Sequence, residues 1–497
     1  MKKRLIKYGI SILSGLLIAL SLPPFKLWFL AFIGFALFSA QLYQANKKLR
    51  FELGFLCAFV QFLISLNWVT GFSIPGYFVL TIVYSFAWGA TSLVVSSSTF
   101  LKHAVSFIPA FTLIDYLKTH FPFGGLPIGS FSIGEVSSPF VSALTVGGET
   151  LLSLITVTVG VILHGLLSRH RNEKNTASTT IVIAIIIGSL DILGTYSTSG
   201  ASIGSISVAI PQGGGTRGLR AVINGNEEQV FNNAVNATLE IPKSKKLDLI
   251  LWPEDVVGLD TNLKNSIDNS VISNLAKTYH ATLIAGVTEP SGNNSFFNLA
   301  VAYSSNGKIT GSYLKVHRVP FGEYVPMRSF FAHFGNVNLV PKNAVAGTKP
   351  GLLVTAAGKL GVMISYECFY GNRALASIDA GATVLIVPTN TASYKSIQVP
   401  LEEVYASRIR AIETGRDLAQ AAPTGYSAVI TRDGTIKTMS NLGNMQVVYG
   451  TLNLYKGKTI YDNVGPLPTV FICIFLLLLV LLFNLKSLHL EKTKEIA

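Results

Sequence analysis

Residues 247–254 read Leu-Asp-Leu-Ile-Leu-Trp-Pro-Glu, an apolar run that ends in a carboxylate. A short run of this kind is typical of a buried strand. Open α/β sheets form their sites at the carboxyl ends of such strands, which is where Glu254 lies. A helix cap or a surface position is the alternative for a single acidic residue. The stretch predicts a strand of an α/β sheet with a candidate site residue at its end.

The sequence around this strand, from about 203 to 457, predicts a water-soluble α/β domain. Short apolar runs alternate there with polar helical stretches and with turns rich in Gly, Pro and Asn. Two runs, 297–304 and 308–315, form a predicted hairpin around the turn 305–307. The domain is therefore predicted to contain a mixed sheet. Further strands are predicted at 205–210, 281–287, 361–365 and 383–388, and helices at 227–239, 270–280 and 401–416.

Two more strand ends of this domain carry side chains that could react. Lys315 ends the hairpin, and Ser365 ends a run that leads into a sharp turn and a predicted helix from Asn372. A turn between a strand and a helix exposes a nucleophile and directs backbone N–H groups at an oxyanion. Taken alone, a solvated lysine and a core strand followed by a plain turn are the alternatives.

The rest of the chain is more apolar than a water-soluble protein. Of its 497 residues, 49% are hydrophobic and 13% are charged, and the mean hydropathy is +0.47. Soluble proteins carry about 25% charged residues, so the composition excludes a disordered chain, a coiled coil and an ordinary soluble enzyme. An N-terminal run and seven further stretches approach the roughly 20 residues that cross a bilayer, which predicts a helical bundle of eight spans. The seven are 27–44, 53–70, 77–99, 104–119, 146–168, 178–196 and 467–485.

The positive charges predict how these spans are oriented. A net charge of +13 could indicate a nucleic-acid partner, but Lys and Arg gather beside apolar runs, as cytoplasmic loops require. We therefore expect no nucleic acid, both termini in the cytoplasm, and three parts: 1–200 with seven spans, 203–457 outside, and 465–497 with the eighth span and a cytoplasmic tail. The clusters are Lys2, Lys3, Arg4 and Lys7; Lys47, Lys48 and Arg50; Lys102 and His103; Arg169, Arg171 and Lys174; and Lys486, Lys492 and Lys494.

Neither a metal site nor a disulfide framework is predicted. Cys57 and Cys473 lie in apolar runs, which leaves Cys368 as the cysteine in polar sequence. The histidines are scattered without the spacing of metal ligands. We expect no metal and no other cofactor.

The motifs at the three strand ends resemble those of a known family. In this order they resemble the nitrilase superfamily, which uses a Glu, a Lys and a Cys at three strand ends. With the predicted spans they resemble its membrane-embedded members, the apolipoprotein N-acyltransferase family. The resemblance implies an α-β-β-α sandwich for the soluble domain. The motifs are Trp252-Pro-Glu254, Lys315 with Pro320-Phe-Gly-Glu-Tyr-Val-Pro326, Ser365-Tyr-Glu367, and Arg408-Ile-Arg-Ala-Ile-Glu-Thr-Gly-Arg416.

The resemblance also implies roles for these residues. Glu254 would be the general base, taking the proton of the nucleophile and later exchanging one with the leaving group or an amine. Lys315 would stabilise the oxyanion and keep the base ionised. Glu323, Tyr366 and Glu367 are expected to support these groups, Glu323 by positioning Lys315 or the substrate.

The nucleophile departs from the family's pattern. The family has Cys directly before an aromatic residue and Glu, and the matching residue here is Ser365. Three interpretations follow: Ser365 is a serine nucleophile, Cys368 one helical turn further on supplies the thiolate, or activity has been lost, naturally or by an engineered change. Ser365 ranks first because it occupies the motif position.

Together these features predict a phospholipid-dependent acyltransferase. As the resemblance implies, a phospholipid in the bilayer donates an acyl chain to the enzyme, and the lipidated N-terminal cysteine of a diacylglyceryl-modified apolipoprotein accepts it on its amine. The expected location is the bacterial cytoplasmic membrane, with the catalytic domain on its extracytoplasmic side. A membrane-anchored amidase of the nitrilase superfamily and a non-catalytic protein that binds lipid or lipoprotein are the alternatives.

Overall fold

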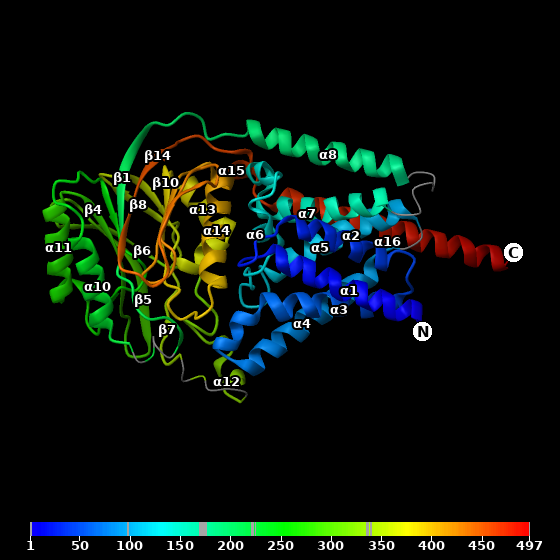
Figure 1. Cartoon of the computed structure of the whole chain (residues 1–497), viewed down its shortest axis with the longest axis horizontal. Coiled ribbons are helices and arrows are strands. Elements are labelled where there is room, and N and C mark those ends of the chain that lie inside the picture. The colour runs from blue at the N-terminus through cyan, green and yellow to red at the C-terminus, as the bar shows by residue number, and fades with distance from the viewer. Residues whose placement is uncertain are drawn as a thin grey trace. The chain divides into compact units, whose positions relative to one another are not determined.

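The chain folds into two compact units. The structure is a computed structural model that describes residues 2–96, 99–167, 176–219, 223, 225–333, 337 and 340–496. One unit, the helical unit, comprises Met1–Ser197 and Val464–Ala497. The other, the α/β unit, comprises Thr198–Asn463. Figure 1 shows the helices and strands of the chain.

The α/β unit contains two mixed β-sheets. In the first, β1, β2 and β4 are parallel, and antiparallel pairs join β14 to β1, β4 to β5 and β5 to β6. In the second, β9, β10 and β11 are parallel, with β8 antiparallel to β9, and β12 antiparallel to both β11 and β13. The first sheet consists of β1 (Gly204–Gln212), β2 (Leu249–Leu251), β3 (Val257–Gly258), β4 (Thr282–Pro290), β5 (Ser295–Tyr303), β6 (Ile309–Leu314), β7 (Asn343–Ala344) and β14 (Gln446–Leu454), and the second of β8 (Leu352–Thr355), β9 (Gly358–Val362), β10 (Val384–Pro388), β11 (Leu418–Ala421), β12 (Ala428–Ile430) and β13 (Ile436–Met439).

The two sheets pack face to face between two layers of helices (Figure 1). The two faces of β1 lie in different cores. Val208 and Ile210 lie in the core between the two sheets, together with residues of β9 and β10. Ala209 points the other way, into a core formed with α10 (Glu227–Leu239) and α11 (Ile267–Tyr279). This alternation follows from the two-residue period of a strand. Helices α13 (Gly371–Asp379) and α14 (Gln398–Thr414) form the outer layer beside the second sheet. The predicted α-β-β-α sandwich is confirmed.

Most predicted elements of this unit are present. The helix predicted at 227–239 is α10, and the predicted hairpin is the antiparallel pair β5–β6. The strand predicted at 361–365 ends earlier, because β9 stops at Val362. Ser365 has a φ of 50°, a left-handed conformation that cannot continue a strand, and it begins the short 3₁₀ helix η6 (Ser365–Phe369).

The helical unit places a helix at each of the eight predicted spans, but the count of eight spans is not confirmed. In the described part of the chain, five helices are long and apolar enough to cross a membrane: Lys2–Ser21, Ile74–Val94, Phe100–Lys118, Val141–Leu167 and Ala177–Tyr196. Two of the other three fall short for identifiable reasons: helix α2 (Phe29–Leu42) has 14 residues, and α3 (Lys47–Ser65) begins with four charged residues in its first six. In α16 (Leu467–Ile496), the apolar stretch Leu467–Leu482 extends to the last residue whose side chain the structure describes. The five are α1 (Lys2–Ser21), α4 (Ile74–Val94), α5 (Phe100–Lys118), α7 (Leu144–Leu167) with the turn before it, and α8 (Thr176–Tyr196).

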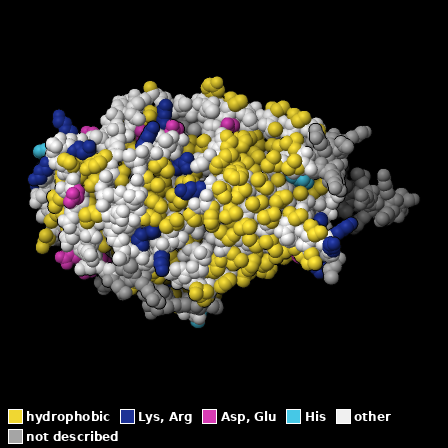
Figure 2. Space-filling view, in the orientation of Figure 1, with side chains coloured by type: hydrophobic (Ala, Val, Ile, Leu, Met, Phe, Trp, Pro, Cys, Tyr) yellow, Lys and Arg dark blue, Asp and Glu magenta, His cyan; other side chains and the backbone are white. Residues whose placement is uncertain are grey.

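Large apolar side chains cover the outside of these helices. Figure 2 shows them as a broad hydrophobic surface with few charges. Such a surface is far larger than the apolar patches of soluble proteins, so the helical unit belongs in a lipid bilayer. The protein is therefore a membrane protein. Exposed examples are Phe78, Val79, Ile82, Val83 and Phe86 of α4, and Ile181, Val182, Ile185, Ile186 and Ile192 of α8.

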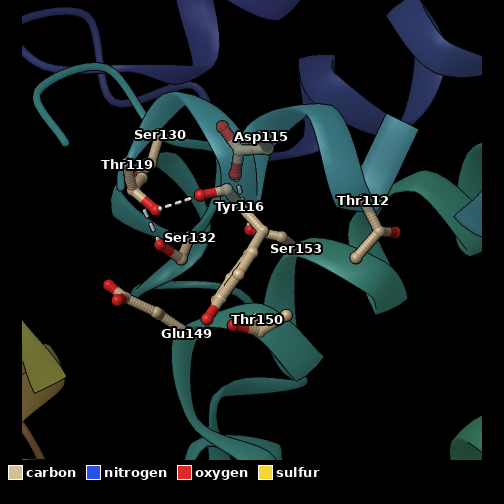
Figure 3. A pocket seen from close by; sticks show the side chains of 9 residues that line it. All are labelled: Thr112, Asp115, Tyr116, Thr119, Ser130, Ser132, Glu149, Thr150 and Ser153. Carbon is tan, nitrogen blue, oxygen red and sulfur yellow. Dashed lines mark hydrogen bonds between the residues drawn. The ribbon is translucent and has the colours of Figure 1, made fainter. Parts of the chain in front are cut away.

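A small polar pocket lies within the helical unit, between α5, α7 and the short helix α6 (Phe131–Glu135) (Figure 3). Its volume of about 10 Å³ leaves room for roughly one water molecule. Asp115 Oδ2 accepts hydrogen bonds from Ser153 Oγ at 2.9 Å and from the Phe131 N–H at 3.3 Å. This carboxylate therefore ties α5 to both neighbouring helices. The pocket is lined by Thr112, Asp115, Tyr116, Thr119, Ser130, Ser132, Glu149, Thr150 and Ser153.

Candidate active site

Two strand ends of the first sheet bring a glutamate and a lysine together. Glu254 follows β2 and Lys315 follows β6, and both side chains are buried, with Lys315 only 1% exposed. Lys315 Nζ donates to Glu254 Oε1 and to Glu323 Oε1, both at 2.8 Å. The residues predicted as base, oxyanion stabiliser and supporting acid thus form one buried ionic cluster, which we call the Lys315 cluster.

Asn298 completes this cluster and was not predicted. Its Nδ2 donates to Glu254 Oε1 and to Glu323 Oε1, both at 2.9 Å, so an amide and an ammonium bridge the same two carboxylates. Its backbone carbonyl also accepts from the Lys315 N–H at 3.0 Å. Asn298 is a polar residue within the apolar run 296–302 of β5, directly beside the strand end that carries Lys315, and this is the signal that could have revealed it.

The charges of the cluster keep the lysine protonated. Burial by itself would lower the pKa of the Lys315 ammonium, but the adjacent Glu254 and Glu323 carboxylates outweigh this effect and raise that pKa above its ordinary value. The chain has thus placed a permanent positive charge at the strand ends. Such a charge can stabilise an oxyanion because it is already desolvated and fixed in position.

The position of Glu254 depends on a close approach between two strands. At Gly286 of β4, an added Cβ would lie 2.1 Å from the Pro253 carbonyl oxygen and 2.6 Å from the Glu254 Cα atom. Only glycine leaves room for the Trp-Pro-Glu strand end to pass here.

Ser365 lies at the elbow between β9 and η6, and Glu367 ties this elbow to the Lys315 strand end. Glu367 Oε2 accepts from the Ile364 N–H at 2.8 Å, and its Oε1 accepts from the N–H groups of Val316 at 2.8 Å and His317 at 3.0 Å. Burial raises the pKa of the Glu367 carboxyl, and these N–H donors oppose that effect. Glu367 therefore links the chain before the candidate nucleophile to the chain after the candidate oxyanion stabiliser.

The two neighbours of Glu367 have different surroundings. Tyr366 is buried and packs against the rings of Phe369 and Tyr370, with ring centroids 5.9 Å and 5.2 Å away. Cys368 is fully buried, and its Sγ lies 3.9 Å from the backbone oxygen of Glu403 on α14. Burial raises the pKa of the Cys368 thiol well above its ordinary value, which disfavours the thiolate that a nucleophile requires. The geometry favours Ser365, 8% exposed, over Cys368.

Sequence reasoning missed a second buried acid, Glu403, which contacts Ser365 directly. Glu403 Oε1 accepts from Ser365 Oγ at 3.3 Å and from Thr389 Oγ1 at 2.5 Å. Burial, and then the negative charge of Glu254, raise the pKa of Glu403 to about 7 against the opposing effect of the Thr389 hydrogen bond. Glu403 follows Glu402 in the helix predicted at 401–416, and no local sequence signal distinguishes it from its neighbours.

Among the described residues, no three side chains of His, Cys, Asp or Glu are grouped so that they could hold a metal ion. The site consists of the Lys315 cluster, the Ser365 elbow and Glu403. In this arrangement a hydroxyl can be acylated, carboxylates can accept protons, and an ammonium can stabilise an oxyanion.

Comparisons with known proteins agree with this architecture. A model of the carbon-nitrogen hydrolase family matches residues 207–460, and a model of the apolipoprotein N-acyltransferase N-terminal domain matches residues 14–162. The chain belongs to the carbon-nitrogen hydrolase family, among the apolipoprotein N-acyltransferases. The family predicted from the three strand-end motifs is confirmed.

Curated relatives match along most of the chain. A protein of Geobacter metallireducens named apolipoprotein N-acyltransferase is 24% identical, covering 92% of this chain and 91% of its own. Proteins of the same name from Haemophilus influenzae and Mycolicibacterium smegmatis are 25% and 28% identical, covering 95% and 84% of this chain and 94% and 75% of their own.

Solved structures resemble about half of the chain. A carbon-nitrogen hydrolase from Helicobacter pylori is 18% identical, covers 50% of this chain and 89% of its own, and has a TM-score of 0.39. Nit3 of Saccharomyces cerevisiae, a member of branch 10 of the nitrilase superfamily, is 21% identical, covers 52% and 93%, and has a TM-score of 0.38.

Proposed function

We propose that this membrane protein transfers an acyl chain from a phospholipid to the amine of the lipidated N-terminal cysteine of a bacterial apolipoprotein. The observation that carries the proposal is the buried Lys315 cluster, in which one ammonium contacts two carboxylates, in the same chain as a helical unit with a lipid-facing surface. The names of the relatives support the same reaction.

In the first half-reaction, Ser365 Oγ attacks the ester carbonyl carbon of the phospholipid. The bond from that carbon to the glycerol oxygen breaks, the bond to Oγ forms, and the hydroxyl proton ends on the glycerol oxygen. The Lys315 ammonium stabilises the oxyanion of the tetrahedral intermediate. The products are an acyl-enzyme and a lysophospholipid.

In the second half-reaction, the acceptor amine attacks the same carbon. The bond to Ser365 Oγ breaks, an amide forms, and one amine proton returns to Oγ. Glu254 is the proposed general base for this transfer. Because the two substrates react in turn through a covalent intermediate, the kinetics are ping-pong.

We also propose that the α/β unit lies on the extracytoplasmic side of the bacterial cytoplasmic membrane. The support is the positive charge at the start of α1 and α3, which favours the cytoplasm. The cluster Arg169, Arg171 and Lys174 lies outside the described residues. A cysteine introduced at exposed Asn306, in the β5–β6 turn, should react in intact cells with a reagent that cannot cross the membrane, and labelling only after lysis would reject this placement.

The experiment that tests the reaction is an intact-mass measurement of the purified protein after incubation with phospholipid. An acyl adduct that resists neutral hydroxylamine and is absent in Ser365→Ala, but present in Cys368→Ala, is expected for an oxygen ester on Ser365. Addition of a lipidated peptide should remove the adduct and produce an amide.

The same measurement separates the alternatives. An amidase would release a carboxylic acid from a small soluble amide and show no lipid adduct. A non-catalytic binding protein would form no adduct even as Ser365→Cys, in which the better thiol nucleophile occupies the motif position.

Glu254→Gln supplies a second test. The amide keeps an oxygen that can accept from Lys315 and Asn298 but cannot take a proton. Amide formation from a preformed acyl-enzyme should fall by about 10²-fold or more, the range for loss of a general base. Unchanged transfer in this variant would remove Glu254 from the mechanism.

A further inference from the structure

The hydroxyl of Ser365 is hydrogen-bonded to a carboxylate outside the Lys315 cluster. Ser365 Oγ donates to Glu403 Oε1 at 3.3 Å, and Thr389 Oγ1 donates to the same oxygen at 2.5 Å. Glu403 is 2% exposed, and its other oxygen, Oε2, has no hydrogen-bond partner among the described residues. A buried carboxylate with one free oxygen, touching the candidate nucleophile, is in position to receive a proton.

Glu254 has different hydrogen-bond partners from Glu403. Its Oε1 accepts from Lys315 Nζ at 2.8 Å and from Asn298 Nδ2 at 2.9 Å. Both donors belong to the Lys315 cluster, and among the described residues no hydrogen bond joins Glu254 to Ser365. Glu403 has hydroxyl groups instead of an ammonium as its direct partners.

We propose that Glu403 is the base that takes the proton of Ser365 as the acyl-enzyme forms, and that Thr389 positions it. The inference rests on the proposed function and refines it. As the bond from Oγ to the acyl carbon forms, the Oγ proton moves to Glu403, and it passes to the glycerol oxygen when that bond breaks. Glu254 retains the transfer that involves the acceptor amine.

This base explains how the chain functions with serine where the family has cysteine. A serine hydroxyl is scarcely ionised near neutral pH and needs an adjacent base, whereas a thiol is partly ionised without one. A carboxylate beside a thiolate even disfavours the thiolate through like charge. Glu403 should therefore accelerate acyl-enzyme formation when residue 365 is serine and should not accelerate it when residue 365 is cysteine.

The test compares four full-length proteins in detergent: the parent, Glu403→Gln, Ser365→Cys and the double variant. The rate of acyl-enzyme formation is measured by intact mass in mixed micelles containing phosphatidylethanolamine and phosphatidylglycerol. Glu403→Gln should slow the serine enzyme by about 10²-fold or more, and should change the cysteine enzyme by less than about threefold. Equal losses in both backgrounds would show a structural role and overturn the inference, as would an unchanged serine enzyme.

Two controls guard against loss of folding. Glu402→Gln replaces the adjacent buried acid, which accepts from Gln398 Nε2 at 2.9 Å, and should leave the rate near that of the parent. Thermal unfolding of each variant shows whether the fold is intact. A slow Glu402→Gln protein with normal unfolding would make the effect of Glu403→Gln non-specific and would overturn the inference.

The pH profile supplies a readout that a structural role would not move. Because the pKa of Glu403 is raised to about 7, the acylation rate of the parent should rise with pH to a plateau above about 7. Thr389→Val removes a hydrogen bond that lowers this pKa, so the rise should move to higher pH, and Glu403→Gln should abolish it. A rise at the same pH in all three proteins would overturn the inference.

The outcomes also separate this inference from the proposed function. An adduct in the two cysteine proteins but in neither serine protein would reject Glu403 as the base of Ser365 and leave the acyltransferase assignment standing. The absence of an adduct in all four proteins would reject both.

Discussion

The Lys315 cluster of the α/β unit and Asp115 of the helical unit hold their carboxyl groups in different ways. In the α/β unit, Glu254 and Glu323 share the ammonium of Lys315 at 2.8 Å, so charge is balanced by charge. In the helical unit, Asp115 is held by the hydroxyl of Ser153 and the backbone N–H of Phe131. The difference lies in the partners: the ion cluster holds fixed charges at the candidate site, whereas the donors to Asp115 join α5 to its neighbouring helices.

Removal of the shared cation should have the largest effect. Lys315→Met leaves Glu254 and Glu323 side by side without their counter-charge, which should lower the free energy of unfolding by about 3–5 kcal/mol. Acyl-enzyme formation should become undetectable. Thermal unfolding and intact mass measure the two effects, with Lys308→Met, an exposed lysine of the same hairpin, as the control. Normal stability of Lys315→Met would contradict the view that charge balances charge here.

Glu403, a buried acid held by hydroxyl groups and not by an ammonium, should make the stability of the protein depend on pH. The pKa of Glu403, about 7 in the folded protein, exceeds the value of about 4.3 for an unfolded glutamate. Between these values the folded state binds more protons, so stability is fully present below about pH 4.3 and falls as pH rises to about 7.

Glu403→Gln should remove this contribution, a change of roughly 3–4 kcal/mol across the window. Chemical denaturation of the parent and the variant at a series of pH values measures it. Parallel stability curves for the two proteins would contradict the raised pKa.

Glu367→Gln tests an acid that is held mainly by backbone donors within the α/β unit. One face of the new amide would point an N–H group at the N–H groups of Ile364 or of Val316 and His317. The free energy of unfolding should fall by about 2 kcal/mol, and the acylation rate should fall as the elbow loosens. If stability falls while the rate is unchanged, the elbow position does not depend on Glu367.

Asp115 provides the matching test in the helical unit. Asp115→Ala removes the acceptor for Ser153 and for the Phe131 N–H and should lower stability by about 1–2 kcal/mol. Asp115→Asn keeps an acceptor oxygen and should cost less than half as much, because neutral donors do not require a charge. Thermal unfolding in detergent distinguishes the two, and equal losses would show that the negative charge itself is needed.

The smallest effect is expected at Glu149, which lines the same pocket but is only partly buried. Glu149→Gln should change the free energy of unfolding by no more than about 0.5 kcal/mol, as at other partly solvated positions. A larger loss by the same thermal measurement would move Glu149 into the group of acids that hold the helices together.

Local signals predicted the α/β unit with its mixed sheet and the residues at its strand ends, and the family resemblance implied the sandwich. A strand, a proline and a reactive side chain follow one another at Glu254, and a hairpin ends at Lys315. The count of eight spans is not confirmed, and at two of the predicted spans the reason is local: α2 is short and α3 begins with charged residues.

Glu403 could not be predicted in the same way, because tertiary contacts alone give it its position, whereas Asn298 left a weak signal as a polar residue in an apolar strand. Asn298 belongs to a strand whose neighbour supplies Lys315, and Glu403 lies on α14, which is buried on nearly all sides despite its charged residues. The Arg410–Glu413 pair shows how α14 tolerates this burial, with Nη1 and Oε2 3.1 Å apart inside the protein.

The position of Glu254 depends on the absence of a Cβ atom at Gly286. Gly286 has no side chain and takes no part in acid–base or covalent chemistry, yet a single methyl group there would overlap the Pro253 carbonyl oxygen and the Glu254 Cα atom. An inherited or engineered alanine at this position would displace the Glu254 carboxylate although residue 254 itself is not mutated. A screen for inactive variants should therefore recover Gly286 together with the charged residues, and a comparison of relatives that inspects only reactive side chains would count such a variant as intact.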